Sequence, residues 1–315
     1  MPEVFSLQRI FYMNKALSAQ TDLNKLKNCQ LFLLDMDGTL YLGDDVFDGA
    51  IEFIHTLDRL GKKYIYLTNN SSRSGSDYVA RLKGMGFPCE AENIYTSGMA
   101  TAEYLRLRCS DRLIFVVGTE TFYNELKAAG LKVFNSKDYD DNDFYINNNY
   151  GLKGMGSAEE FREYLDVTDN LPVVCVGFDT ELVYRDLDLA VHYLRKNAAF
   201  IAANPDWVCP MPKGEVLPDC GSICALLTAS SGKEPRYIGK PNRKMVDIIS
   251  QMKGIPNEKI CCVGDRLYTD IAVAQNAGAV SVCVLSGECN EAEIAEMKNK
   301  PDYTLDNVAE LGKIL

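Results

Sequence analysis

The sequence predicts an α/β protein whose core is a doubly wound parallel sheet, interrupted by an inserted α/β domain. Short apolar runs alternate with segments of helical periodicity along most of the 315 residues. Several of these runs end in acidic, amide or lysine side chains, as strands do at the ligand-binding edge of an open sheet. Prolines and a glycine cluster between 205 and 218, which is typical of a connection between domains. We therefore expect a core at 1–107 and 207–315, with the inserted domain at 108–206.

The first predicted strand ends in two carboxylates and a glycine turn. Leu31 to Leu34 is continuously apolar, as expected for a central parallel strand that is covered on both faces. Asp35 follows at its carboxyl end, and Gly38 permits a sharp exit of the chain. Asp35 and Asp37 are two residues apart and can face one pocket.

Further predicted strands and helices follow along the chain. Before all of them lies a polar lead-in at 1–29, which we expect to pack on the outside of the first domain. The predicted strands are 64–67, 94–96, 113–117, 131–134, 144–147, 171–177, 199–202, a strand ending at 237–241, 260–263 and 280–285. The predicted helices are 51–60, 78–85, 119–129, 187–196, 222–228, 245–252 and 271–277. Residues 138–156 are rich in Asp, Asn, Tyr and Gly and predict mostly surface loop.

Composition excludes several classes of function. The formal net charge is -11, from 44 acidic and 33 basic residues, so no broad basic surface exists to bind nucleic acid or an anionic membrane. The eleven cysteines form no Cys-x-x-Cys pair and only His55 and His192 are present, which disfavours a zinc site and favours buried free thiols. No signal peptide and no apolar stretch of about 18 residues is found, so we expect a cytoplasmic protein.

Four predicted strands end in side chains of complementary chemistry. Parallel strands of one sheet present their carboxyl ends on the same edge, so these residues are expected to meet. They are Asp35 with Asp37, Thr68 with Asn69, Lys240, and Asp265.

This set fits phosphate ester hydrolysis. A carboxylate nucleophile divides the reaction into formation and hydrolysis of an aspartyl-phosphate, and Asp35 is the candidate. Asp37 is placed to protonate the leaving oxygen and then to activate water. The hydroxyl and amide groups of Thr68, Asn69 and Asn70, with the charge of Lys240, can hold the transferring phosphoryl group.

A divalent cation is required by the charge balance of this set. Asp35, Asp37, Asp265 and Asp270 would together repel a phosphate dianion, and Lys240 alone offsets them. Magnesium suits a site of oxygen ligands that also holds a substrate phosphate. We expect Asp35 and Asp265 to bind it through their side chains and Asp37 through its backbone carbonyl.

Each candidate has a plain structural alternative. The acidic turn at 35–38 and the segment at 264–270 could serve only as helix caps. Lys240 could be a surface lysine at a helix start. Asp179 also follows an apolar strand but has no second Asp two residues on, so we interpret it as a structural or pocket-rim residue. His55 and His192 lie in predicted helices without partners and are interpreted as core or surface residues.

Taken together, these segments resemble the four motifs of the haloacid dehalogenase-like phosphatases. They are Asp-Met-Asp-Gly-Thr at 35–39, Leu-Thr-Asn-Asn-Ser-Ser-Arg at 67–73, Gly-Lys-Pro at 239–241 and Gly-Asp-Arg-Leu-Tyr-Thr-Asp at 264–270. The large insertion between the second and third motifs resembles the 4-nitrophenyl phosphatase or NagD-like branch, as do Thr-Ser-Gly-Met-Ala-Thr-Ala-Glu-Tyr-Leu at 96–105 and Val-Gly-Phe-Asp at 176–179.

The resemblance implies a role for each matching residue. Asp35 would be the nucleophile and Asp37 the acid/base, Thr68, Asn69, Asn70 and Lys240 would hold phosphate, and Asp35, Asp37 and Asp265 would hold magnesium. Asp270 would lie in the shell around the metal ligands. The insertion would be a cap domain that contacts substrate, here through Asn204, Asp206 and Cys209, and that often forms a homodimer contact. Some relatives place a histidine near Cys209, and its absence leaves their substrate preference in doubt for this chain.

We therefore expect a magnesium-dependent phosphatase of a small phosphorylated metabolite. Nucleotides, sugar phosphates, phosphoglycolate and pyridoxal phosphate all stay open as substrates. A phosphotransferase or mutase of the same fold is the nearest alternative, since the motifs do not reveal what accepts the phosphoryl group. A regulator that is phosphorylated on Asp35 is a further alternative, disfavoured by the intact Asp37, and a dehalogenase would have no need of the magnesium set.

Overall fold

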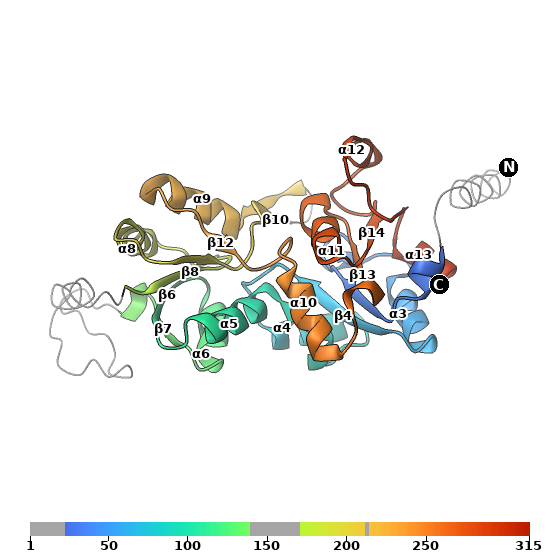
Figure 1. Ribbon diagram of the computed structural model, residues 1–315, viewed down its shortest axis with the longest axis horizontal. Coiled ribbons are helices and arrows are strands. Elements are labelled where there is room, and N and C mark those ends of the chain that lie inside the picture. Colours follow the sequence, from blue (N-terminus) through green and yellow to red (C-terminus); the bar gives the residue numbers. More distant parts are fainter. Residues whose placement is uncertain (1–22, 139–170, 212–213) are drawn as a thin grey trace.

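The computed structural model describes residues 23–138, 171–211 and 214–315. Two parallel sheets lie side by side, each with helices on both faces (Figure 1). The predicted strand at 144–147 and nearly all of the predicted lead-in and loop lie outside the described residues. Within the described part, no helix has both the length and the apolar character that crossing a membrane requires.

The first sheet has six strands, all parallel, in the order β15-β14-β13-β1-β4-β5. Its strands are β1 (Leu31–Leu34), β4 (Lys63–Thr68), β5 (Ile94–Thr96), β13 (Ile260–Gly264), β14 (Val280–Val284) and β15 (Tyr303–Leu305). β1 lies between β4 and β13, so the central position predicted from its apolar run is confirmed.

Helices cover both faces of this sheet, which explains the continuous apolar runs of its strands. Leu31 and Leu33 of β1 belong to one buried cluster, and Phe32 and Leu34 belong to another on the opposite face. The helices around the sheet are α3 (Ala50–Arg59), α4 (Gly75–Gly84), α5 (Ser97–Arg108), α10 (Lys244–Lys253), α11 (Ala272–Ala277), α12 (Glu291–Glu296) and α13 (Val308–Ile314), and the short α2 (Leu23–Lys27) precedes β1. This arrangement confirms the predicted doubly wound α/β class.

The second sheet has five parallel strands, in the order β12-β9-β8-β6-β7. They are β6 (Leu113–Val117), β7 (Lys132–Phe134), β8 (Val173–Val176), β9 (Phe200–Ala202) and β12 (Arg236–Tyr237). α6 (Glu120–Ala128), α8 (Tyr184–Arg195) and α9 (Cys220–Ser231) belong to this part of the molecule. We call this sheet and its helices the cap.

The chain leaves the cap later than the expected boundary at 207. Residues of α9 pack with β6 and β8 in one buried cluster, and Tyr237 in β12 pairs with Ala202 in β9. The proline-rich stretch between them is a hairpin, β10 (Val208–Pro210) with β11 (Val216–Pro218). This pairing could not be predicted, because β12 has two residues, too few for a pattern to show which sheet it joins.

The placement of β12 corrects one premise of the predicted site. Lys240 was expected at the end of a strand in the same sheet as Asp35, but the strand before it belongs to the cap. Lys240 therefore reaches the site on the segment by which the chain returns from the cap to the core.

Candidate active site

Asp35 and Asp37 lie at the carboxyl edge of the six-stranded sheet, as predicted. The backbone N–H of Asp35 donates to the carbonyl oxygen of Val263 at 2.9 Å, which continues the β1–β13 ladder by one residue. The chain then turns at Gly38, whose φ is +84°. A Cβ atom at this glycine would collide with the carboxylate of Asp265, so the close approach of the two loops needs a residue without a side chain.

Lys240 is buried between two carboxylates. Its Nζ atom lies 2.5 Å from Oδ1 of Asp35 and 2.6 Å from Oδ1 of Asp270, and 3% of its side chain is exposed. Burial by itself would lower the pKa of Lys240, but the charges of Asp270 and Asp35 outweigh this effect and raise it. The lysine is therefore held in its charged form.

Asn69 holds the backbone of Lys240 in place. Its Oδ1 atom accepts a hydrogen bond from the backbone N–H of Lys240 at 2.8 Å, and its Nδ2 group donates to the carbonyl oxygen of Lys240 at 3.0 Å. The same Nδ2 group lies 3.3 Å from Oδ1 of Asp206. The side chain of Asn69, predicted to bind phosphate, is thus committed to fixing Lys240 and Asp206.

Thr68 and Asn70 complete the loop after β4. The Oγ1 atom of Thr68 accepts a hydrogen bond from the backbone N–H of Asn70 at 3.1 Å. The Oδ1 atom of Asn70 in turn accepts from the backbone N–H of Ser72. Both side chains line the same pocket as Asp35, Asp37 and Lys240. The structure therefore brings together the residues that the first three motifs predict.

Asp35, Asp265 and Asp270 form a compact acidic group. One carboxylate oxygen from each lies within 4.8 Å of the others. Burial raises the pKa of Asp35 well above its ordinary value, with a further contribution from the charge of Asp270. Burial and Asp270 likewise raise the pKa of Asp265 to about 6. Three crowded oxygen ligands of this kind fit a hard divalent cation.

Asp270 is the member of this acidic group that was not among the predicted metal ligands, since it was expected in the shell around them. The carboxylate of Asp37 lies outside the group, and Asp37 was expected to bind through its backbone carbonyl. Asp265 is held by the backbone N–H of Glu288, which donates to its Oδ2 atom at 2.8 Å. Asp270 is held by the backbone N–H of Arg266 at 3.2 Å.

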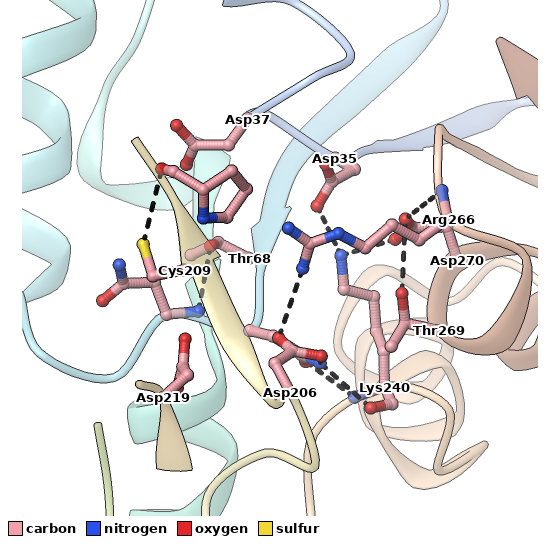
Figure 2. Close-up of a pocket in the computed structure, with 13 residues that line it drawn as sticks. Asp35, Asp37, Thr68, Asp206, Cys209, Asp219, Lys240, Arg266, Thr269 and Asp270 are labelled. Atoms are coloured by element: carbon pink, nitrogen blue, oxygen red, sulfur yellow. Dashed lines mark hydrogen bonds and ion pairs between the residues drawn. The ribbon is translucent and has the colours of Figure 1, made fainter. Parts of the chain in front are cut away.

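Asp37 lines the pocket on the side away from Asp270 (Figure 2). Burial raises the pKa of its carboxyl, and the charges of Arg81 and Arg266 offset only part of that effect. The protonated form is therefore favoured more than in water, which suits a group that must give a proton to a leaving oxygen.

The cap supplies the opposite wall of the pocket. Asp206 and Cys209 line it, as predicted, but Asn204 does not. Asn204 is fully buried, and its Nδ2 group lies 3.3 Å from Asp206 and 3.0 Å from Asp219. Asn204 therefore shapes the loop that carries Asp206.

Arg266 and Asp219 are two residues of the site that the sequence did not single out. The guanidinium of Arg266 lies in the middle of the pocket in Figure 2, with Nη1 at 3.7 Å from Asp206. Burial raises the pKa of Asp219 to about 7, with the charge of Asp206 as the second cause. Arg266 adjoins Asp265 in the fourth motif, and that proximity was the available signal. Asp219 caps α9, where an acidic residue is ordinary.

Family models match both parts of the chain that hold the acidic motifs. Residues 32–132 match a haloacid dehalogenase-like hydrolase model and residues 237–311 match an HAD-hydrolase-like model. An acid sugar phosphatase from Staphylococcus haemolyticus is 30% identical over 90% of this chain and 95% of its own length. The chain belongs to the haloacid dehalogenase-like hydrolase family. A phosphoglycolate phosphatase from Arabidopsis thaliana is 29% identical over 90% of this chain and 92% of its own length.

Solved structures of this family have the same fold. A 4-nitrophenylphosphatase from Thermotoga maritima has a TM-score of 0.76 and 37% identity, and the alignment covers 92% of this chain and 98% of that one. A glycerol phosphate phosphatase from Mycobacterium tuberculosis, solved in complex with magnesium, has a TM-score of 0.74 and 26% identity over 91% of this chain and 77% of that one. The predicted family, fold class and phosphatase activity are therefore confirmed.

Proposed function

We propose that this family member hydrolyses a phosphate monoester of a small metabolite through an aspartyl-phosphate on Asp35, with magnesium as cofactor. The observation that carries the proposal is the arrangement of Lys240 between Asp35 and Asp270, next to Asp265. Burying a lysine and its carboxylate partners costs desolvation free energy. A site that keeps such a group therefore points to a function that uses both charges. Phosphoryl transfer has such a use, because it needs a carboxylate nucleophile and positive charge at the phosphoryl oxygens.

Each step has a residue in position. A carboxylate oxygen of Asp35 forms a bond to phosphorus while the ester P–O bond breaks, and Asp37 gives its proton to the leaving oxygen. Asp37, now ionised, then takes a proton from the water that attacks phosphorus, and phosphate leaves Asp35. Thr68, Asn70 and Lys240 hold the phosphoryl oxygens, while Asn69 positions Lys240.

Asp35, Asp265 and Asp270 are the side chains that would hold magnesium, with the backbone carbonyl of Asp37 as a further ligand. The raised pKa values of Asp35 and Asp265 indicate that Lys240 alone does not balance the three carboxylates. The ion would supply the missing positive charge and offset the repulsion between these carboxylates and the substrate phosphate.

The decisive experiment measures phosphate release from a panel of phosphorylated metabolites and 4-nitrophenyl phosphate, with magnesium or with EDTA. We expect turnover that needs magnesium and is abolished in Asp35→Asn. Asp179→Asn is the matched control, because Asp179 is also buried after an apolar strand but lies outside the residues that line this pocket. Retained turnover in Asp35→Asn would refute the assignment. A phosphorylated Asp35 without turnover would point to a transferase or a regulator.

We also propose that two copies associate through the cap hairpin. Trp207, Val216 and Leu217 lie on or beside β10 and β11, and 59%, 53% and 39% of their surfaces are exposed. Apolar side chains gathered on one hairpin are typical of an interaction surface. Sedimentation of the wild type and of Val216→Asp tests this, with a dimer expected for the first and a monomer for the second. A monomeric wild type would refute it.

A cytoplasmic location, without nucleic acid or membrane partners, stays a prediction. The expected absence of nucleic acid and membrane partners rests on the net charge of -11. Cell fractionation with a nucleic-acid binding assay tests it.

A further inference from the structure

A second cavity adjoins the reaction pocket. The reaction pocket has a volume of about 30 Å³, and the second cavity has about 220 Å³. Asp37, Asn70, Cys209 and Pro210 line both. The smaller volume is enough for one or two water molecules, so the substrate beyond its phosphoryl group needs other space.

Asp37 indicates where that space is. If Asp37 protonates the leaving oxygen, that oxygen lies beside Asp37, at the boundary between the two cavities. The leaving group then extends into the second cavity, whose other lining residues are Tyr41, Gly43, Asp44, Arg73, Tyr78, Arg81 and Met211.

Arg81 is fixed in this cavity by its surroundings. Its guanidinium lies 5.4 Å from the centre of the Tyr41 ring, and 23% of its side chain is exposed. The Nη2 atom of Arg81 donates to the carbonyl oxygen of Gly43 and also lies 3.2 Å from Oδ1 of Asp44. Because 92% of the Asp44 side chain is exposed, this ion pair is weak and a better-placed anion could replace it.

Arg73 adds a second positive charge, and Tyr41 adds a hydroxyl beside Arg81. Arg73 is exposed at the rim and makes no ion pair with any residue in the described ranges. Tyr41 is only 1% exposed, and its hydroxyl interacts with the guanidinium of Arg81. Because a tyrosine hydroxyl can accept from a guanidinium and donate its own proton, it can also donate to an anion bound at Arg81.

The other wall of the reaction pocket has the opposite charge. Asp206 and Asp219 line it, and Arg266, whose Nη1 atom lies 3.7 Å from Asp206, is already paired with that carboxylate. A negatively charged leaving group would therefore be repelled from that wall and attracted toward Arg73 and Arg81.

We propose that Arg73, Arg81 and Tyr41 form a subsite for a second anionic group, a carboxylate or a phosphate, on the leaving group. The substrate class is then a phosphate monoester that carries a second anion. Arginine suits this role because its planar N–H groups bind carboxylate and phosphate with two parallel hydrogen bonds. The inference rests on the proposed phosphatase mechanism and narrows its substrate.

The test compares three esters that share a two-carbon skeleton. 2-Phosphoglycolate carries a carboxylate, ethylene glycol bisphosphate carries a second phosphate, and 2-hydroxyethyl phosphate carries a neutral hydroxyl. We expect wild-type kcat/KM to be at least about 10-fold higher for one of the two anionic esters than for the neutral one. The preferred anionic ester identifies which anion the subsite takes.

Arg73→Gln and Arg81→Gln should each lower the ratio of kcat/KM for the preferred anionic ester to that for the neutral ester, by about 10- to 100-fold. Arg59→Gln is the control, because Arg59 makes its ion pair with Glu52 at the surface of α3, and it should leave the ratio unchanged. A wild-type preference for the neutral ester, or a ratio that neither arginine variant changes, would overturn the subsite. Equal hydrolysis of all three esters would overturn the subsite alone, whereas hydrolysis of none with magnesium would count against the proposed function itself.

Discussion

Replacing Asn69 by alanine should loosen Lys240, although the lysine itself is untouched. The variant removes the hydrogen bonds at 2.8 and 3.0 Å that fix the backbone N–H and carbonyl group of Lys240. Lys240 is 2% exposed, so neither group can turn to bulk water. Leaving a buried polar group unpaired costs about 1–3 kcal/mol. Two such groups predict a loss of roughly 2–6 kcal/mol in the free energy of unfolding.

The assay is thermal unfolding followed by circular dichroism, together with steady-state kinetics on 4-nitrophenyl phosphate. A loss of 2–6 kcal/mol corresponds to a fall in Tm of roughly 4–15 °C for a chain of this size. We also expect KM to rise, because Lys240 can no longer be held between Asp35 and Asp270. The same Tm and KM as the wild type would refute the reasoning.

Asn70→Ala is the matched control for stability. Asn70 is the next residue in the same loop, but its Oδ1 atom accepts only from the nearby N–H and hydroxyl of Ser72, at 2.9 and 2.8 Å. These groups are half-buried, so water can replace the lost partner. Asn70→Ala should therefore lower the free energy of unfolding by about 1 kcal/mol or less.

Two further predictions concern the acid/base residue and a buried carboxyl outside the site. Asp37→Asn should lower kcat by about 10²- to 10⁴-fold on an alkyl phosphate and by a smaller factor on 4-nitrophenyl phosphate, whose leaving group needs less protonation; equal losses on both would contradict the proposed acid. Glu125 in α6 has a pKa that burial raises to about 7, so its protonated form stabilises the fold at low pH, and that stability is lost as the pH rises from about 4.5 through 7. Denaturant unfolding at pH 5 and pH 8 should show a loss of stability that is up to about 3 kcal/mol larger in the wild type than in Glu125→Gln, and parallel behaviour of the two proteins would contradict it.

The site residues that end a strand or directly follow one could be predicted from the sequence. Asp35 follows four apolar residues bounded by polar ones, and such a short continuous run is typical of a central strand of a covered sheet. Thr68 is the last residue of β4, the neighbouring strand, so the same rule places it beside Asp35. Periodicity and strand direction were sufficient for these residues.

The rest depends on long-range pairing that no local pattern contains. β12 has two residues, and its pairing with β9 determines that Lys240 arrives from the cap. The prolines at 210 and 218 suggested a linker, yet both lie in the hairpin of β10 and β11. The position of Arg266 next to Asp265 hinted at a role in the site, but its burial could not be predicted, because it depends on Asp206 and Glu288, which come from other parts of the chain.

The distances around Asp206 indicate where the closed pocket can open. The reaction pocket of about 30 Å³ has room for little more than a phosphoryl group, so we expect Asp206 and Cys209 of the cap to move away from the core when substrate enters. The contacts that cross this boundary at Asp206 are long, at 3.3 Å to Asn69 and 3.7 Å to Arg266. The bonds from Asn69 to Lys240 are shorter, at 2.8 and 3.0 Å, and come in a pair. Separation therefore costs least between Asp206 and Asn69, and we infer that Lys240 stays with Asp35 when the cap moves. The phosphate-binding groups are then kept together in the open form, and the cap adds the wall formed by Asp206, Cys209 and Asp219.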